Sequence, residues 1–502
     1  MLSYPIKISR VARLCGVLLF TALSLLATTL PSSAIDLVST TVDEEQGDGE
    51  ILFGFCASAD GMLVVFTTSS QLSPLDTNDT RDIYLKDRAT RELTLISMNF
   101  AGNGAGSGNS QSPRISADGR YIVFESAANN LLPSDVNNNS DIFLYDREMD
   151  SLTILSQFAN GDQADNVSGS PDISEDGTVV TFTSKSNLVG TDTNGLFDIF
   201  IRSVSDPSTI QLVSQNTMGN AGDGGSSKPA LSGDGRYVAF YSQAGDLATT
   251  DSNGSGFDVF RYDRITENVV HVSRNQAGTA SGNGIALGAS INYDGSKVAY
   301  KSTSSDVVPE DTDADADIYL RDFSENETLL VSKNTAGDKG DGSSNSSNYA
   351  LSSDGNFIAF QSTSTNMGGQ PGDNVYLRNL TTGETISLTD TPDGQGPDSL
   401  LQSPELSRDG STAIFVANAS NLVNFDANGD VSDLFAAPGT DLTVDKAALA
   451  AAAAAALRKA KLKKKLRKQK KQLRTARRGK KAAKIKRLKK KIKKTKKKIR
   501  KV

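Results

Sequence analysis

The dipeptide Asp-Gly recurs seven times at nearly constant intervals, and this repeat constrains the fold more than any other feature. The copies lie at Asp60, Asp118, Asp176, Asp234, Asp294, Asp354 and Asp409, so successive copies are 55 to 60 residues apart. Each copy follows an apolar-Ser or similar pair and precedes an apolar run, as in SADGRYIVFES and SGDGRYVAFYS. A repeat of this length indicates one supersecondary unit copied seven times.

The pattern within one copy predicts four short strands. In the second copy these are PRIS, RYIVFES, DIFLYDR and LTILSQ, separated by the Asp-Gly turn or by polar loops. Four strands joined in this way form one antiparallel sheet. The second and third strands are apolar at consecutive positions, which indicates burial on both faces. Seven such sheets predict an all-β fold, a seven-bladed β-propeller, and a two-sheet sandwich or a solenoid suits the unit less well.

The two ends of the repeat region complement each other. The segment IDLVSTTVDEEQGDG near the start resembles the fourth-strand segments QLVSQNTMGNAGDG and LLVSKNTAGDKGDG, whereas the seventh copy stops after its third strand, DLFAAPG. We therefore predict that residues 36–42 form the outer strand of the seventh blade and close the ring. The competing segment, residues 440–444, is shorter and lacks the Val-Ser signature.

These motifs carry a resemblance to a known family. The element I/L-S-x-D-G with its apolar run, followed by D-I-F/Y-L-x-D and L-x-x-V-S, resembles the WD-like repeat of TolB-type propellers and covers about four fifths of the chain. The resemblance implies an exported bacterial propeller that serves as a binding module or scaffold, and less often as an enzyme or peptidase gate. TolB also carries an α/β domain ahead of its propeller. Nothing here corresponds to that domain, so TolB's partners are not carried over.

The composition divides the chain into four segments. Residues 1–34 have a basic start, an apolar run from Leu14 to Leu30 and the small residues Ser32-Ser33-Ala34, which is typical of a secretory signal peptide. An uncleaved membrane anchor is the alternative, and either interpretation predicts export to the periplasm, the cell surface or the medium. Residues 35–440 are the predicted propeller, 441–456 an Ala-rich linker and 457–502 a Lys/Arg-rich tail. Without the signal peptide Cys56 is the only cysteine, so the body has no intramolecular disulfide.

The tail differs sharply in charge from the propeller. It holds 28 Lys and Arg and no acidic residue, whereas residues 35–456 hold 22 basic and 59 acidic residues. Narrow apolar stripes predict a helical or disordered tail, with a weak coiled coil as the alternative. Such a tail binds polyanions by counterion release, and export favours an envelope polyanion or anionic lipid over nucleic acid. Docking on the chain's own acidic propeller stays open.

Six of the seven copies carry an Asp-rich loop between their second and third strands. Alternating oxygen side chains can converge on a hard cation, and calcium is the natural ion for an exported protein. No loop has the EF-hand pattern, and Asn and Asp also cap turns without an ion, so turn capping is the competing interpretation. The sequence implies no other cofactor. The candidate calcium ligands are Asp76, Asn78, Asp82, Asp135, Asn137, Asp141, Asp192, Asn194, Asp198, Asp311, Asp313, Asp315, Asp317, Asp426, Asn428 and Asp430.

Strand alternation assigns the connections to two faces of the ring. The second-to-third and fourth-to-first connections share one face, which we call the loop face, and the Asp-Gly turns and third-to-fourth connections share the opposite, turn face. The loop face is acidic and rich in hydrogen-bonding groups, so it is the predicted surface for an unidentified protein or glycan.

Catalytic motifs are scarce in the sequence. There is no Gly-x-Ser-x-Gly elbow, and the single histidine, His271, stands where other copies have Leu95, Ile154, Leu212 and Leu330. We therefore predict a non-catalytic binding or scaffolding module. A polysaccharide hydrolase or lyase that uses paired carboxylates on the loop face is the alternative.

Overall fold

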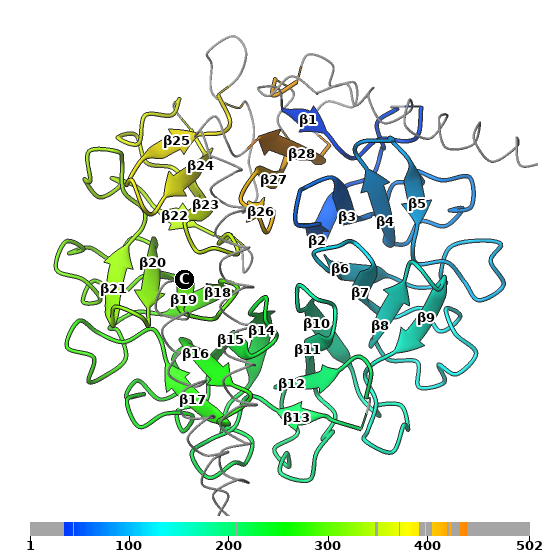
Figure 1. Cartoon of the computed structure of the whole chain (residues 1–502), viewed down its shortest axis with the longest axis horizontal. Coiled ribbons are helices and arrows are strands. Elements are labelled where there is room, and N and C mark those ends of the chain that lie inside the picture. Colours follow the sequence, from blue (N-terminus) through cyan, green and yellow to red (C-terminus); the bar gives the residue numbers. More distant parts are fainter. Residues whose placement is uncertain are drawn as a thin grey trace, which may run out of the picture. The chain divides into compact units, whose positions relative to one another are not determined.

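The computed structural model describes residues 35–43, 45–206, 208–346, 350–370, 372–390, 397, 404–418, 421–423 and 431–438. Within these residues the chain forms 28 strands and no helix. The strands make seven four-stranded antiparallel sheets, which surround a common centre as the blades of a propeller (Figure 1). The predicted all-β, seven-bladed fold is confirmed.

The first strand of each blade lies nearest the centre and the fourth lies at the rim (Figure 1). Blade 1 contains β2 (Ile51–Ala57), β3 (Leu63–Thr68), β4 (Asp82–Asp87) and β5 (Leu93–Leu95), and blade 2 contains β6 (Ser110–Ile115), β7 (Tyr121–Ser126), β8 (Asp141–Asp146) and β9 (Ser151–Ile154). Blade 3 contains β10 (Ser168–Ile173), β11 (Val179–Ser184), β12 (Asp198–Ser203) and β13 (Gln211–Leu212), and blade 4 contains β14 (Ser226–Leu231), β15 (Tyr237–Ser242), β16 (Asp258–Asp263) and β17 (Asn268–His271). Blade 5 contains β18 (Ala286–Ile291), β19 (Lys297–Ser302), β20 (Asp317–Asp322) and β21 (Glu327–Leu330), and blade 6 contains β22 (Ser344–Asn345), β23 (Phe357–Ser362), β24 (Asn374–Asn379) and β25 (Thr385–Ser387). Blade 7 contains β26 (Glu405–Leu406), β27 (Thr412–Ala417), β28 (Asp433–Pro438) and, from the other end of the chain, β1 (Asp36–Leu37).

The N-terminal segment closes the ring, as predicted. Strand β1 pairs antiparallel with β28, with Leu37 opposite Phe435, and Val38 N–H donates to the Leu434 carbonyl at 2.8 Å. The regular strand is shorter than the predicted residues 36–42, because the chain then turns and Thr40 bridges back to Gln46. The competing segment 440–444 lies outside the described residues.

A buried lysine attaches the closing segment to blade 1. Lys86 on β4 donates from Nζ to the carbonyls of Thr40 and Thr41 at 3.1 and 3.0 Å. Arg88, near the end of the same strand, pairs with Asp36 at 3.1 Å. The closing segment is therefore held from both sides, by strand pairing in blade 7 and by cations of blade 1.

The Asp-Gly turns form a second closed ring at the centre of the turn face. In all seven turns the glycine has φ between +67° and +75°, which explains why the repeat requires glycine there. In each turn a backbone N–H of a residue just before the glycine donates to a backbone carbonyl in the turn of the next blade, and the turn of blade 7 donates to the turn of blade 1. The seven bonds run from Ala59 N to Ala117 O, Ala117 N to Glu175 O, Glu175 N to Gly233 O, Asp234 N to Tyr293 O, Tyr293 N to Ser353 O, Ser353 N to Arg408 O and Asp409 N to Ala59 O, at 2.8 to 3.1 Å.

The core lies between neighbouring blades. The second and third strands of each blade pair aromatic rings across the sheet, as Phe124 and Phe143 do at a centroid distance of 5.7 Å, and both rings are fully buried. Blades thus bury both faces, as the consecutive apolar runs predicted. In the part of the chain that is described, no helix is long and apolar enough to cross a membrane. The predicted signal peptide, linker and tail lie outside that part.

Candidate functional site on the loop face

The described Asp-rich loops place their last aspartate inside the blade, at the start of the third strand. This aspartate is fully buried in blades 1, 2, 3 and 5, where the first aspartate is at most 6% exposed, whereas Asp251 of blade 4 is only partly buried. We call the first and last aspartates of a loop the carboxylate pair of a blade. The pairs are Asp76 and Asp82, Asp135 and Asp141, Asp192 and Asp198, Asp251 and Asp258, and Asp311 and Asp317. The predicted ligands Asp426, Asn428 and Asp430 of blade 7 lie outside the described residues.

The last aspartate accepts a short hydrogen bond from a serine of the fourth-strand segment. The same serine oxygen accepts the N–H that follows the aspartate, as Ser97 does from Ile83 at 2.9 Å. In blade 6 Asn374 and Thr389 make the corresponding bond at 3.1 Å. The serine bonds join Ser97 to Asp82, Ser156 to Asp141, Ser214 to Asp198, Ser273 to Asp258, Ser332 to Asp317 and Ser39 to Asp433, at 2.5 to 2.6 Å.

This serine is the second residue of the Val-Ser signature or of its equivalent in each copy. Sequence reasoning used the signature to recognise the closing strand but did not assign it a chemical role. Because Ser39 lies just after β1, blade 7 makes the Asp–Ser bond between the two ends of the propeller. Six Asp–Ser bonds, and the Asn374–Thr389 bond that takes their place in blade 6, show that the last polar residue of the loop has a structural function in every blade.

The asparagine at the third loop position caps the turn. Asn78, Asn137 and Asn194 each accept, at Oδ1, the N–H two residues further on, at 2.7 to 2.8 Å. Each also donates from Nδ2 to a carbonyl of the following fourth-to-first connection, at 2.8 to 2.9 Å. These bonds place the two kinds of connection on one face, as predicted, and give the asparagines the geometry of Asx turns. Whether calcium also binds remains a prediction.

In four blades a donor from the fourth-to-first connection reaches the carboxylates, and in blade 4 this donor is Ser281, which donates to Asp251 at 3.2 Å. Gln163 donates to both Asp135 and Asp141 at 2.8 Å in blade 2, and in blade 7 Gln46 donates to Asp433 at 3.2 Å. Gln163 and Gln46 occupy the same position of the repeat, because each forms the isolated bridge that follows the fourth strand of its blade. Ser281 of blade 4 and Lys339 of blade 5 occupy the same bridge position.

Blade 5 brings together three of the four aspartates predicted to bind calcium there. Ligand oxygens of Asp311, Asp313 and Asp317 lie within 4.8 Å of one another, whereas Asp315 is exposed and outside the group. Lys339 lies in this group, with Nζ 2.9 Å from Asp317 and 3.0 Å from Asp313. Burial lowers the pKa of Lys339, but its bonds to these carboxylates outweigh burial and raise the pKa overall. The chain therefore supplies this cluster with its own cation.

Burial dominates the electrostatics of the remaining pairs. It raises the pKa of Asp82 to about 7 and the pKa of Asp141 to about 6. The pKa of Asp192 rises to about 6, first through burial and then through the neighbouring Asp198 carboxylate. Asp76 differs from Asp192 in accepting the hydroxyl of Tyr84 at 2.6 Å.

The histidine lies beside a serine and an aspartate without forming a catalytic arrangement. His271 Nε2 is 3.1 Å from Asp258 and 3.3 Å from Ser273, and Ser273 itself donates to Asp258 at 2.6 Å. A nucleophilic serine would donate to the imidazole instead. The Ser273–Asp258 bond also occurs in blades that have no histidine, and the His271 ring is only 2% exposed. His271 is therefore a structural residue.

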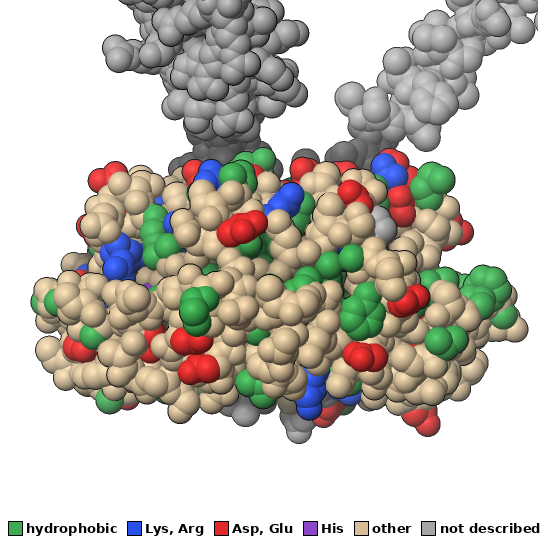
Figure 2. Space-filling model, turned by 90° about the horizontal axis from the view of Figure 1, so that it is seen from below, with side chains coloured by type: hydrophobic (Ala, Val, Ile, Leu, Met, Phe, Trp, Pro, Cys, Tyr) green, Lys and Arg blue, Asp and Glu red, His purple; other side chains and the backbone are tan. Residues whose placement is uncertain are grey.

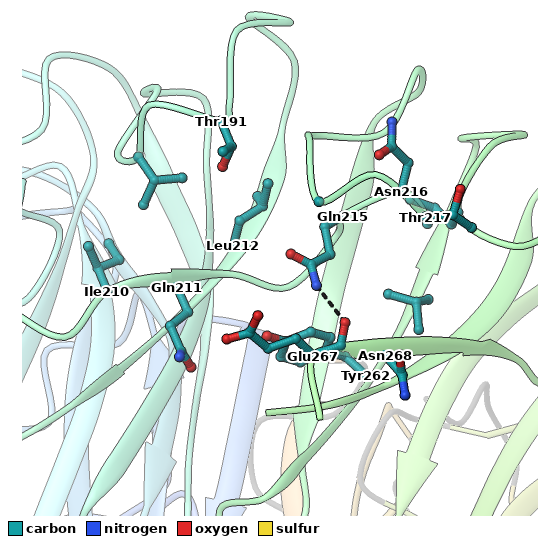
Figure 3. A pocket seen from close by; sticks show the side chains of 14 residues that line it. Thr191, Ile210, Gln211, Leu212, Gln215, Asn216, Thr217, Tyr262, Glu267 and Asn268 are labelled. Carbon is teal, nitrogen blue, oxygen red and sulfur yellow. Dashed lines mark hydrogen bonds between the residues drawn. The ribbon is translucent and has the colours of Figure 1, made fainter. Parts of the chain in front are cut away.

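A pocket with a volume of about 580 Å³ lies between blades 3 and 4. In Figure 3 Ile210 and Leu212 lie on one side and the amides of Gln215 and Asn216 on the other. Gln215 Nε2 donates to the Glu267 carbonyl at 2.6 Å. Amide, hydroxyl and apolar groups and the Glu267 side chain line this pocket, a composition that suits binding of a polar ligand.

The loop face also exposes large apolar side chains. Figure 2 shows the ring edge-on, where hydrophobic side chains stand out singly from a mainly polar surface. Met218 is 80% exposed, Val136 75% and Phe100 68%, and all three belong to second-to-third or fourth-to-first connections. Val42, Leu75, Leu196, Phe197 and Ile285 are exposed on connections of the same kinds. Single exposed apolar side chains are common on soluble proteins, and here they add apolar contact area to a face rich in amides and hydroxyls.

The sheets and their connections thus define a seven-bladed β-propeller with structural carboxylates inside its loop face.

No model of a known protein family and no curated protein matches the chain. It is similar in structure to the β-propeller domain of the Trilobed protease from Pyrococcus furiosus, at 12% identity and a TM-score of 0.47, covering 78% of this chain and 96% of that one. It is also similar to TolB from Acinetobacter baumannii, at 15% identity and a TM-score of 0.33, covering 86% of this chain and 71% of that one. A TolB-type protein from Agrobacterium tumefaciens matches at 16% identity and a TM-score of 0.36, covering 64% of this chain and 91% of that one. The seven-bladed propeller that the resemblance to TolB-type repeats implies is present in the seven sheets themselves.

Proposed function

We propose that this chain is an exported, non-catalytic propeller that acts as a binding or scaffolding module at the cell envelope. The observation that carries the proposal is the loop face, where exposed apolar side chains such as Phe100 and Met218 stand among amide and hydroxyl groups. Such a surface fits a protein or glycan partner.

The buried polar groups support a non-catalytic role. The described carboxylate pairs hold strands and turns together, and His271 shares a bond pattern that other blades make without it. Among the residues that the structure describes, we find no observation that favours the alternative hydrolase or lyase.

The basic tail is proposed to retain the protein at the envelope. Its 28 positive charges in residues 457–502 favour anionic cell-wall polymer, lipopolysaccharide or anionic lipid as the partner. Release of counterions would make this retention depend steeply on salt.

Co-sedimentation with isolated envelopes over a salt series tests this proposal. The full chain is expected to sediment at about 50 mM salt and to be released by about 200 mM, while a chain that ends at residue 456 stays in solution throughout. Thermal melting of both chains is the control for folding. Retention that does not change with salt, or equal retention of the shorter chain, would move the binding activity from the tail to the propeller.

A further inference from the structure

The blades differ in what neutralises their carboxylate pairs. In blade 5 Lys339 Nζ lies between the two aspartates, 3.6 Å from Asp311 and 2.9 Å from Asp317. In blade 2 the Gln163 amide takes this place and contacts both carboxylates. The repeat therefore contains one defined position between the carboxylates at which the chain itself supplies positive charge or a donor.

Blade 3 lacks the donors that serve this position elsewhere. The residue related to Gln163 and Lys339 by the repeated bridge is Ala221. The residue related to Tyr84, which donates to Asp76 in blade 1, is Phe200. Both replacements remove a polar hydrogen next to the same pair of carboxylates.

Three oxygens of this pair consequently lack a well-aligned hydrogen-bond partner among the described residues, and only the uncharged Asn194 approaches both carboxylates. The three are both carboxylate oxygens of Asp192 and Oδ2 of Asp198, whose other oxygen accepts from Ser214. Asp192 is 1% exposed and Asp198 is fully buried. Two buried carboxylates without a counter-charge are strongly unfavourable, so the pair requires either a cation or a proton.

We propose that the Asp192–Asp198 pair binds one hard divalent cation, with calcium as the ion to test, at the position that Lys339 Nζ occupies in blade 5. Carboxylate oxygens are the ligands that such cations prefer. The neighbouring residue Thr191 lines the pocket between blades 3 and 4 (Figure 3), so Asp192 lies one residue from an open recess. The predicted calcium function of the loops is thereby assigned to blade 3, where neither the bridge position nor the third strand supplies a donor to the carboxylates.

The test compares thermal melting of the full chain, freed of metal with chelator, over a calcium series at pH 7.5. A ligand that binds only the folded state raises Tm with its concentration, and at a hundredfold excess over Kd we expect a rise of about 2–5 °C. Potassium chloride at matched ionic strength is the control for charge screening. No calcium-dependent rise in Tm would overturn the proposal, and a Tm that rises only on acidification would show that the pair shares a proton.

Two variants identify the site. Ala221→Lys copies the arrangement of blade 5, so we expect it to melt higher than the parent without calcium and to lose the calcium response. Asp192→Asn removes a ligand with little change in volume, so it should fold and also lose the response. In calorimetric titrations each variant should bind one calcium ion fewer than the parent. An unchanged number of bound ions in Asp192→Asn would place any calcium site elsewhere and contradict the proposal.

Discussion

At the scale of residues, one hydrogen-bonded unit is repeated around the ring. The last loop aspartate accepts a serine hydroxyl, and the serine in turn accepts the N–H of the next residue. Blade 6 shows that the negative charge is dispensable, because Asn374 and Thr389 form the same unit without it. The buried carboxylates therefore serve as hydrogen-bond acceptors, and their charge has an energetic cost.

Replacing Asp82 by Asn tests this cost. Burial raises the pKa of Asp82 in the folded state to about 7, so the folded protein binds this proton more tightly than the unfolded chain does. The stability that the bound proton contributes is fully present below the ordinary pKa of an aspartate and is lost as the pH rises through 7. The free energy of unfolding of the parent should therefore gain about 2 kcal/mol from this group between pH 8 and pH 5.5. Asp82→Asn should remove that part of the pH dependence and equal or exceed the parent in stability at pH 8.

Urea unfolding of both proteins at the two pH values measures this effect. Asp60→Asn on the turn face is the matched control, and it should leave the pH dependence of Asp82 in place. If Asp82→Asn retained the whole pH dependence of the parent, the raised pKa would be wrong.

At the scale of elements, the closing segment completes a blade that is otherwise one strand short. Strand β1 supplies the outer strand of blade 7, and Ser39 supplies the serine of the repeated unit. Lys86 holds the same segment from blade 1. An open edge of β28 would otherwise expose unpaired N–H and C=O groups.

Deleting residues 36–42 should therefore lower Tm and promote aggregation. A milder variant, Ser39→Ala, leaves the strand in place but removes one buried hydrogen bond, at an expected cost of about 1–3 kcal/mol. Ser156→Ala removes the equivalent bond inside blade 2 and is the matched control. Melting curves and light scattering check these outcomes, and a deletion variant that melts like the parent would exclude the closure.

The elements were largely predictable from the sequence, because the seven copies repeat the same strand and turn pattern. The Val-Ser signature also identified β1 as the closing strand, which pairs with β28. The carboxylate partners were not predictable in the same way, since Gln163 and Lys339 come from connections whose position relative to the loops only the fold reveals. An alignment of the copies would have shown that Gln163 and Lys339 correspond to Ala221, but not that these side chains contact the loop carboxylates.

At the scale of the whole propeller, the two faces are built differently. The turn face is tied together by the ring of backbone bonds between Asp-Gly turns. The loop face consists of longer connections that expose apolar and amide groups. This asymmetry leads us to assign binding to the loop face.

Array binding of matched variants tests this central claim most directly. The full chain would be applied to glycan and peptide arrays at about 300 mM salt, where the contribution of the basic tail is screened. The loop-face variant carries Val136→Ser and Phe100→Ser, and the control carries Met149→Ser and Ile265→Ser on third-to-fourth connections of the turn face. These control residues are 69% and 72% exposed, so the two variants lose similar exposed apolar groups.

The parent and the turn-face variant are expected to bind the same ligands, which mass spectrometry should recover unchanged, and the loop-face variant should lose that binding. Loss of binding in the turn-face variant alone, conversion of the bound ligand to product, or the absence of any bound glycan or peptide would contradict the account.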